Sequence, residues 1–174
     1  MRSKSAEYQQ TGVLPERELI ARKLVPSRSR LDAGPVVVVE CIEQIPCDPC
    51  AHACPRSAIT VGPNLTDTPR VDFDKCNGCA ICVARCPGLA IFVVNRAYSE
   101  TEATVTLPYE MLPRPTEGSR VTLLDRAGRP VGRGRVVRMR DTKVQDRCAV
   151  VTVTVPKRLL NAVRGIRVSG RKGA

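Results

Sequence analysis

The stretch from Cys76 to Pro87 limits what this chain can fold into more than any other. It has the pattern C-x2-C-x2-C-x3-C-P, and its cysteines are Cys76, Cys79, Cys82 and Cys86. Thiolates at this spacing hold [4Fe–4S] cubanes: three of them ligate one cluster and the fourth points to another. Gly78 has no Cβ, so the backbone there can approach the sulfur atoms and aim N–H groups at them. The stretch therefore predicts iron–sulfur ligation.

A second cysteine run lies upstream and is imperfect. Cys47, Cys50 and Cys54 give C-x2-C-x3-C-P, and Cys41 completes the run with a first gap of five residues. If the fourth ligands cross between the two runs, the eight cysteines form two sets. One cluster is then held by Cys41, Cys47, Cys50 and Cys86, and the other by Cys76, Cys79, Cys82 and Cys54. Crossed ligation ties the runs together, so loss of the clusters should unfold this region.

Both cysteine runs are flanked by short apolar segments with strand character, in the order strand, cysteine run, strand, repeated once. The expected strands are 36–39, 58–61, 70–73 and 90–94. Residues 36–96 thus resemble bacterial two-cluster ferredoxins. The resemblance implies an α+β module in which two clusters lie between two hairpins related by a pseudo-two-fold axis.

The C-terminal region, residues 97–174, has no metal motif. Segments 103–107, 120–124 and 148–155 alternate between apolar and polar residues, as strands do. Residues 156–163 are expected to form a short helix, with proline at its first turn and glycine just beyond its end. We expect a small, mostly β, barrel-like domain here.

The N-terminal region, residues 1–35, is expected to be an arm or linker with a short helix over 16–24. Two interpretations stay open: an arm that lies on another subunit, or a loosely ordered terminus. The predicted organisation is therefore an arm (1–35), a dicluster domain (36–96) and a basic β domain (97–174).

The formal charge of +11 is unevenly distributed along the chain. These three regions carry +3, −1 and +9 respectively. A basic C-terminal region suits either an acidic partner protein or nucleic acid. Its only tyrosines are Tyr98 and Tyr109, which make a poor platform for base stacking. Partner docking is therefore favoured and nucleic-acid binding is not.

The ligand assignment has alternatives. Paired C-x2-C motifs also form zinc ribbons, but zinc leaves Cys82 and Cys86 without a role. The second run could also hold a single cubane, with the first run degraded. Cys148, the ninth cysteine, lies in an alternating apolar segment and is expected to be a buried thiol. His52, the only histidine, is expected to be solvated, with hydrogen bonding to a cluster as the alternative.

Other functional signals are missing from the sequence. It has no phosphate-cradling glycine motif, flavin site or clear nucleophile–base pair, so we expect an electron carrier and not an enzyme. It has no apolar run long enough to span a membrane and no leader-like apolar segment near Met1. Together with many cysteines, this favours reduced thiolates in the cytoplasm.

A longer set of motifs points to one class of electron carrier. The segments Glu40–Cys50, Cys86–Ile91 and Leu107–Glu110 resemble those of small iron–sulfur subunits that accompany FAD-dependent amine, imino-acid or opine-type dehydrogenases. The resemblance implies flavin-bearing partner subunits, with FAD bound only there, and a [2Fe–2S] subunit as a further partner. The alternatives are a free soluble ferredoxin and an iron–sulfur protein that binds nucleic acid.

Overall fold

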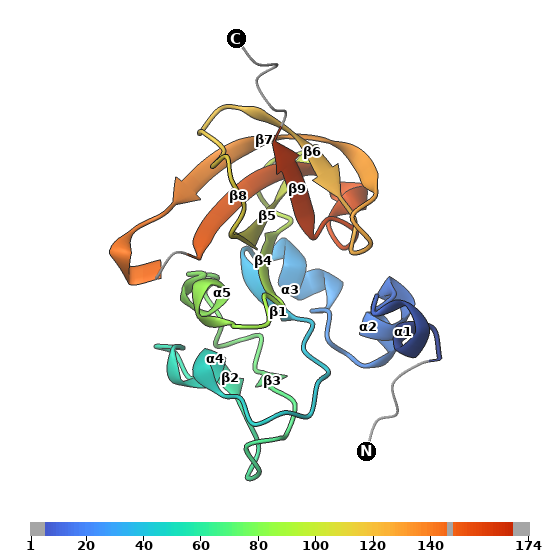
Figure 1. The fold of residues 1–174 in the computed structure, drawn as a ribbon, viewed down its shortest axis with the longest axis vertical. Helices are drawn as coiled ribbons and strands as arrows, with labels where there is room; N and C mark the ends of the chain where they lie inside the picture. Colours follow the sequence, from blue (N-terminus) through green and yellow to red (C-terminus); the bar gives the residue numbers. More distant parts are fainter. Residues whose placement is uncertain (1–5, 146–147, 169–174) are drawn as a thin grey trace.

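The computed structural model describes residues 6–145 and 148–168. Within these residues, seven strands form one antiparallel sheet in the order β1-β4-β5-β8-β7-β6-β9, and β2 pairs with β3 separately (Figure 1). The strands of the large sheet, in that order, are Val36–Val39, Ile91–Asn95, Glu102–Tyr109, Ala149–Pro156, Pro130–Arg140, Arg120–Leu124 and Gly165–Val168. The small hairpin consists of β2, Ile59–Thr60, and β3, Arg70–Val71. This mixture of helices and antiparallel strands agrees with the expected α+β class.

Strands β1 and β4 separate two apolar cores. Val36 and Val38 face the larger core with the C-terminal strands, whereas Val37 and Val39 face the core that contains the cysteines. The paired strand β4 alternates in the same way. A strand covered on both faces needs apolar residues at every position, which explains the unbroken run of four valines in β1.

The larger core lies under the C-terminal strands, which curve over β1 and β4 in Figure 1. Val121 and Leu123 of β6 point into this core, as do Val151 and Val153 of β8. The sequence predicted a separate barrel-like unit beginning at residue 97. In the structure, β4 pairs directly with β5, so the sheet runs across the expected boundary between residues 96 and 97. The division of the chain into domains stays a prediction.

The C-terminal end differs from its sequence-based prediction. The helix expected over 156–163 is wrong: only Lys157–Leu159 forms a 3-10 turn, η2. Strand β9, which starts at Gly165 and pairs with β6, was not predicted from the sequence. The N–H of Arg164 donates to the carbonyl of Leu124 at 3.0 Å, which brings the end of the chain to β6. This non-local strand pairing overrides the local helix signals.

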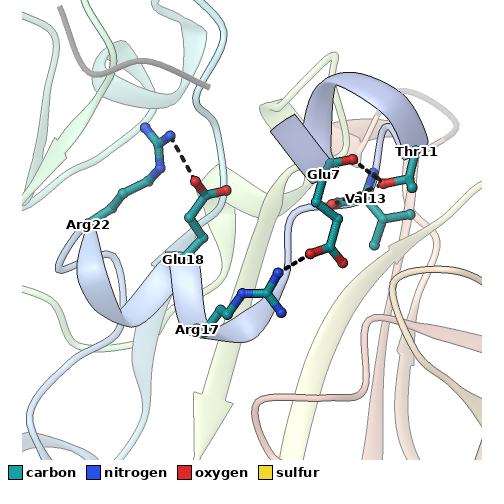
Figure 2. A network of polar contacts seen from close by, with 6 residues as sticks. All are labelled: Glu7, Thr11, Val13, Arg17, Glu18 and Arg22. Atoms are coloured by element: carbon teal, nitrogen blue, oxygen red, sulfur yellow. Dashed lines mark hydrogen bonds and ion pairs between the residues drawn. The ribbon is translucent and has the colours of Figure 1, made fainter. Parts of the chain in front are cut away.

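The N-terminal arm contains three short helices, α1 (Ala6–Thr11), α2 (Glu16–Ala21) and α3 (Arg28–Asp32). Leu14 and Leu19 pack with Ile42 in a small core of their own. Figure 2 shows the ion pair between Glu7 and Arg17, which joins α1 to α2, and a second ion pair between Glu18 of α2 and Arg22, which caps that helix. Residues 6–35 therefore fold onto their own chain, and residues 1–5 lie outside the described part.

Helix α3 occupies the segment that the sequence marked as a linker. The Ser27 hydroxyl accepts a hydrogen bond from the Arg30 N–H at 3.2 Å and caps the helix. Leu31 is buried in the larger core, which fixes the helix against the sheet. As a result, Arg30 is directed at the cysteine-rich region.

Candidate iron–sulfur centre

The first group of thiols consists of Cys54, Cys76, Cys79 and Cys82. These four cysteines line one hollow together with apolar side chains that include Val37, Ile59 and Val93. Cys82 is one of the buried residues of helix α5, Ile81–Arg85. Burial, followed by the nearby thiolates of Cys79, Cys76 and Cys54, raises the pKa of Cys82 to about 12. The four cysteines therefore share one hollow, in which burial disfavours the ionised form of Cys82.

Backbone N–H groups surround the sulfur atoms of this group. Val37 and Gly78 both donate to Cys76 Sγ at 3.4 Å, and Ala58 donates to Cys54 Sγ at 3.3 Å. Gly78 has a φ of +69°, and a Cβ at this position would lie 2.5 Å from the Cβ of Pro35. A side chain would clash with Pro35 here, and the Gly78 N–H points at the Cys76 sulfur, as the sequence predicted.

The second group consists of Cys41, Cys47, Cys50 and Cys86. Helix α4, Pro49–His52, carries Cys50. Burial, then the Cys86 thiolate and more weakly those of Cys47 and Cys41, raises the pKa of Cys50 to about 11. The Ala90 N–H donates to Cys86 Sγ at 3.4 Å. Cys86 follows α5, so the fourth cysteine of one run lies with the three cysteines of the other.

The two groups have the same members as the two ligand sets predicted from the sequence. All nine cysteines lie in the described part of the chain and are free thiols. In residues 6–145 and 148–168, no three or more histidine, cysteine, aspartate or glutamate side chains lie close enough together to hold a metal ion. The all-thiol donor sets, the N–H groups directed at sulfur and the cradle at Gly78 suit iron–sulfur clusters. Ligation by these eight residues stays a prediction.

A buried ion-pair network lies beside Cys41. The Glu40 carboxylate accepts hydrogen bonds from Arg126 Nε at 2.8 Å, Arg126 Nη2 at 2.7 Å and Arg164 Nε at 2.6 Å. Burial by itself would raise the pKa of Glu40, but the two guanidiniums outweigh this effect and hold it below its usual value. The guanidinium of Arg164 also lies over the Phe92 ring, 5.0 Å from its centroid. The network fastens the C-terminal strands to the residue that precedes the first predicted ligand.

Two further arginines contact the group formed by Cys54, Cys76, Cys79 and Cys82. Arg30 donates from Nη2 to the Cys76 carbonyl at 2.6 Å and from Nε to the Phe73 carbonyl at 2.8 Å. Arg140, at the end of β7, donates from Nη1 to the Cys79 carbonyl at 3.3 Å. Burial and then the charge of Arg138 lower the pKa of Arg140, while the Cys79 thiolate opposes this shift.

No sequence pattern pointed to any of these four arginines. They lie 43 to 124 residues along the chain from the groups of Glu40, Phe73, Cys76 and Cys79 that they contact. Arg140 is one arginine among several in a strand pattern, and Arg164 directly follows the segment that was expected to be helical. Nothing local in the sequence marks either residue as part of the site.

Two other residues, His52 and Cys148, are exposed and buried respectively, as the sequence predicted. The His52 side chain is 79% exposed, and its Nε2 lies 2.9 Å from Asp48 Oδ2. Cys148 is buried, and burial followed by the negative charge of Glu110 raises its pKa to about 11. Neither residue belongs to the two groups of four thiols.

Comparison with known proteins identifies the cysteine-rich part of the chain. Residues 40–90 match the family described as 4Fe-4S dicluster domain, so this segment is a 4Fe-4S cluster-binding domain of the ferredoxin type. The isethionate sulfite-lyase activating enzyme of Desulfovibrio desulfuricans is 40% identical over 63 residues, which cover 34% of this chain and 20% of the relative. The chain thus spans about a fifth of this curated relative. No solved structure gives a significant match.

In the part of the chain that the structure describes, no helix is both long enough and apolar enough to cross a membrane.

Proposed function

We propose that the chain relays electrons one at a time as a non-catalytic subunit of an oxidoreductase complex. In this proposal two [4Fe–4S] clusters are bound, one by each group of thiols, and FAD-bearing dehydrogenase subunits supply the electrons. The observation that carries the proposal is the presence of two four-thiol groups, each with backbone N–H groups directed at sulfur. The complex would oxidise an amine, imino acid or opine-type substrate, with a [2Fe–2S] subunit as a further partner. Nine free cysteines favour the cytoplasm, where thiols stay reduced.

When bound, the clusters supply one-electron transfer at potentials that are set by charge, hydrogen bonds to sulfur and solvent access. The chain itself contributes the thiolates that hold iron and the N–H groups that stabilise negative sulfur. Val37 and Val93 line one of the thiol groups and keep water away from it. Residues 36–96 provide these parts, whereas the sheet beyond them offers a surface for a partner.

A hollow of about 500 Å³ on the C-terminal strands is the proposed docking surface. Arg120, Arg133 and Arg135 line it, and its lining also includes Tyr98 and Glu102. Arg120 lies directly opposite Arg135 in the β6–β7 pair. Like charges in this position destabilise a sheet. An acidic partner surface would relieve that repulsion, so the three arginines favour an acidic partner at this hollow.

The test is an anaerobic pull-down of the tagged chain from its native cell, with the eluate assayed for flavin, iron and sulfide. Stoichiometric flavin-bearing subunits together with cubane iron would support the proposal. A lone iron–sulfur chain would contradict it in favour of a free ferredoxin, and co-purified nucleic acid would favour the nucleic-acid alternative. A triple variant with glutamine at 120, 133 and 135 should lose the partner and keep its iron. Glutamine at the exposed Arg17 and Arg28 serves as the control.

A second candidate function follows from the Desulfovibrio desulfuricans relative, which is named as an activating enzyme. Here the same cluster-binding module would pass electrons to an activation reaction and not away from a flavin. Recovery of a lyase-type partner without flavin in the same pull-down would favour this candidate.

A further inference from the structure

The two thiol groups differ in the charged side chains that surround them. Glu43 lies two residues after Cys41 and Asp48 directly follows Cys47, so each places a carboxylate near a thiol of one group. Cys79, in the other group, has the guanidinium of Arg140 beside it. One group is thus bordered by negative charge and the other by positive charge.

The arginines beside the group that contains Cys79 keep most of their positive charge uncompensated. In the described residues, Arg30 donates to the carbonyls of Phe73, Gly34, Pro35 and Cys76, and no carboxylate is among its partners. The two arginines near Cys41 behave differently, because Arg126 and Arg164 both direct their guanidiniums at the Glu40 carboxylate. Glu40 offsets one of these two positive charges, so the pair contributes less positive charge to the neighbouring thiols.

Hydrogen bonds to sulfur and burial do not oppose the effect of this charge. Val37, Gly78 and Ala58 donate backbone N–H groups to sulfur in the group with Cys79, and Ala90 donates to Cys86 in the other group. The most buried thiol of each group, Cys50 and Cys82, is 8% and 7% exposed. The positive charge beside Cys79 therefore acts in the same direction as the hydrogen bonds to sulfur.

We infer that the group formed by Cys54, Cys76, Cys79 and Cys82 holds the cluster with the higher reduction potential, and that Arg140 is a main cause of this order. This inference rests on the proposed function only in requiring that both groups hold a cluster. An electron from an external one-electron donor then resides first on this cluster, which passes from [4Fe–4S]2+ to [4Fe–4S]+ with no bond made or broken. The reduced form carries one more negative charge, and nearby guanidiniums stabilise that added charge.

The same charges give the relay a direction. An electron that enters at the group with Cys41 and Cys47 would move downhill to the group with Cys79. Arg140 belongs to β7, the strand that also carries Arg133 and Arg135 of the proposed docking hollow. The strand that would meet a partner is therefore also the strand that tunes the cluster beneath it.

The test is a redox titration of the anaerobically isolated, cluster-loaded chain. Dithionite is the reductant, and electron paramagnetic resonance monitors the reduced clusters. We compare the native chain with Arg140→Gln, the charge-retaining Arg140→Lys and the control Arg17→Gln, an exposed arginine of α2. At an effective dielectric constant of about 20, a unit charge within roughly 12 Å changes the reduced-to-oxidised ratio about tenfold. Arg140→Gln should therefore lower the higher-potential step by about 59 mV. Arg140→Lys should largely restore the step, and Arg17→Gln should not move it.

A complementary variant tests the other group. Asp48→Asn removes a negative charge beside Cys47 and should raise the lower-potential step only. A shift of the lower step by Arg140→Gln, a shift of the higher step by Asp48→Asn, or no shift in either variant would overturn the inference. If Arg140→Gln does not retain both clusters, Asp48→Asn decides the order without it. Iron and sulfide contents are measured on every sample, so failure of cluster binding, and hence of the proposed function, is seen separately from a wrong order.

Discussion

Replacing Glu40 by glutamine should destabilise this protein strongly, although the two side chains have almost the same shape. The Glu40 side chain is 8% exposed, and the side chain of its partner Arg164 is 3% exposed. The neutral amide cannot balance the charge of Arg164, which would then be buried without a counterion. The side-chain nitrogen of the glutamine would also face guanidinium donors and could not accept a hydrogen bond from them, because an amide has only one acceptor oxygen.

The magnitude follows from the geometry of the network. Breaking a buried ion pair by removal of one partner costs about 3–5 kcal/mol of unfolding free energy. For a chain of this size each kcal/mol lowers the melting temperature by roughly 2–4 °C. We therefore expect the melting temperature to fall by about 6–20 °C. By contrast, Arg129→Gln removes an exposed partner of Asp125 in the neighbouring turn and should cost about 1 kcal/mol or less.

The assay is thermal unfolding of the cluster-loaded protein under anaerobic conditions, monitored by circular dichroism. In an Arg164→Met background the effect of Glu40→Gln should be smaller, since Arg164, the more deeply buried of the two arginines, no longer needs a counterion. If Glu40→Gln lowers the melting temperature no more than Arg129→Gln does, the buried network contributes no net stability and this reasoning is refuted.

The network also predicts a pH dependence. The arginines hold the pKa of Glu40 below its usual value, so its stabilisation is present above the unfolded-state pKa of about 4.3. It is lost as the pH falls through the lower pKa of the folded state. The difference between native chain and variant should therefore be constant from pH 7 to pH 5 and shrink only in stronger acid. A difference that shrinks already between pH 7 and pH 5 would contradict the direction of this pKa shift.

Three further predictions concern the thiols and the sheet. Cys41→Ser should lower the iron content from about eight toward four atoms per chain, or leave one three-iron cluster; unchanged iron and spectra would refute Cys41 as a ligand. Burial raises the pKa of Cys148 to about 11, so iodoacetamide at pH 8 should leave it unmodified in the folded protein, and rapid alkylation seen by mass spectrometry would contradict this. Truncation after residue 96 removes β5 from β4 and exposes Val36, Val38 and Phe92; the product should aggregate, and a monodisperse truncated chain in size-exclusion chromatography would show that residues 36–96 fold by themselves.

The sequence by itself determined the features that depend on short stretches of chain. The spacing from Cys76 to Cys86 predicted the cluster-binding domain, because ligands of one cluster must lie within a few residues of one another. Apolar runs located β1 and β4, and alternation located β5, β6 and β8. Local signals failed at residues 156–163 because strand pairing, not helix propensity, decides the conformation there.

Only the tertiary structure decided how these parts combine. It joined the C-terminal strands to β4 in one sheet, where the sequence predicted a separate barrel. It also brought Arg30, Arg126, Arg140 and Arg164 to the cysteine-rich region from distant parts of the chain. Cysteine ligands are recognised from their spacing because a cluster constrains neighbouring residues. The charges around a cluster depend on long side chains from remote strands, and no local pattern specifies where the packing of a whole sheet will place them.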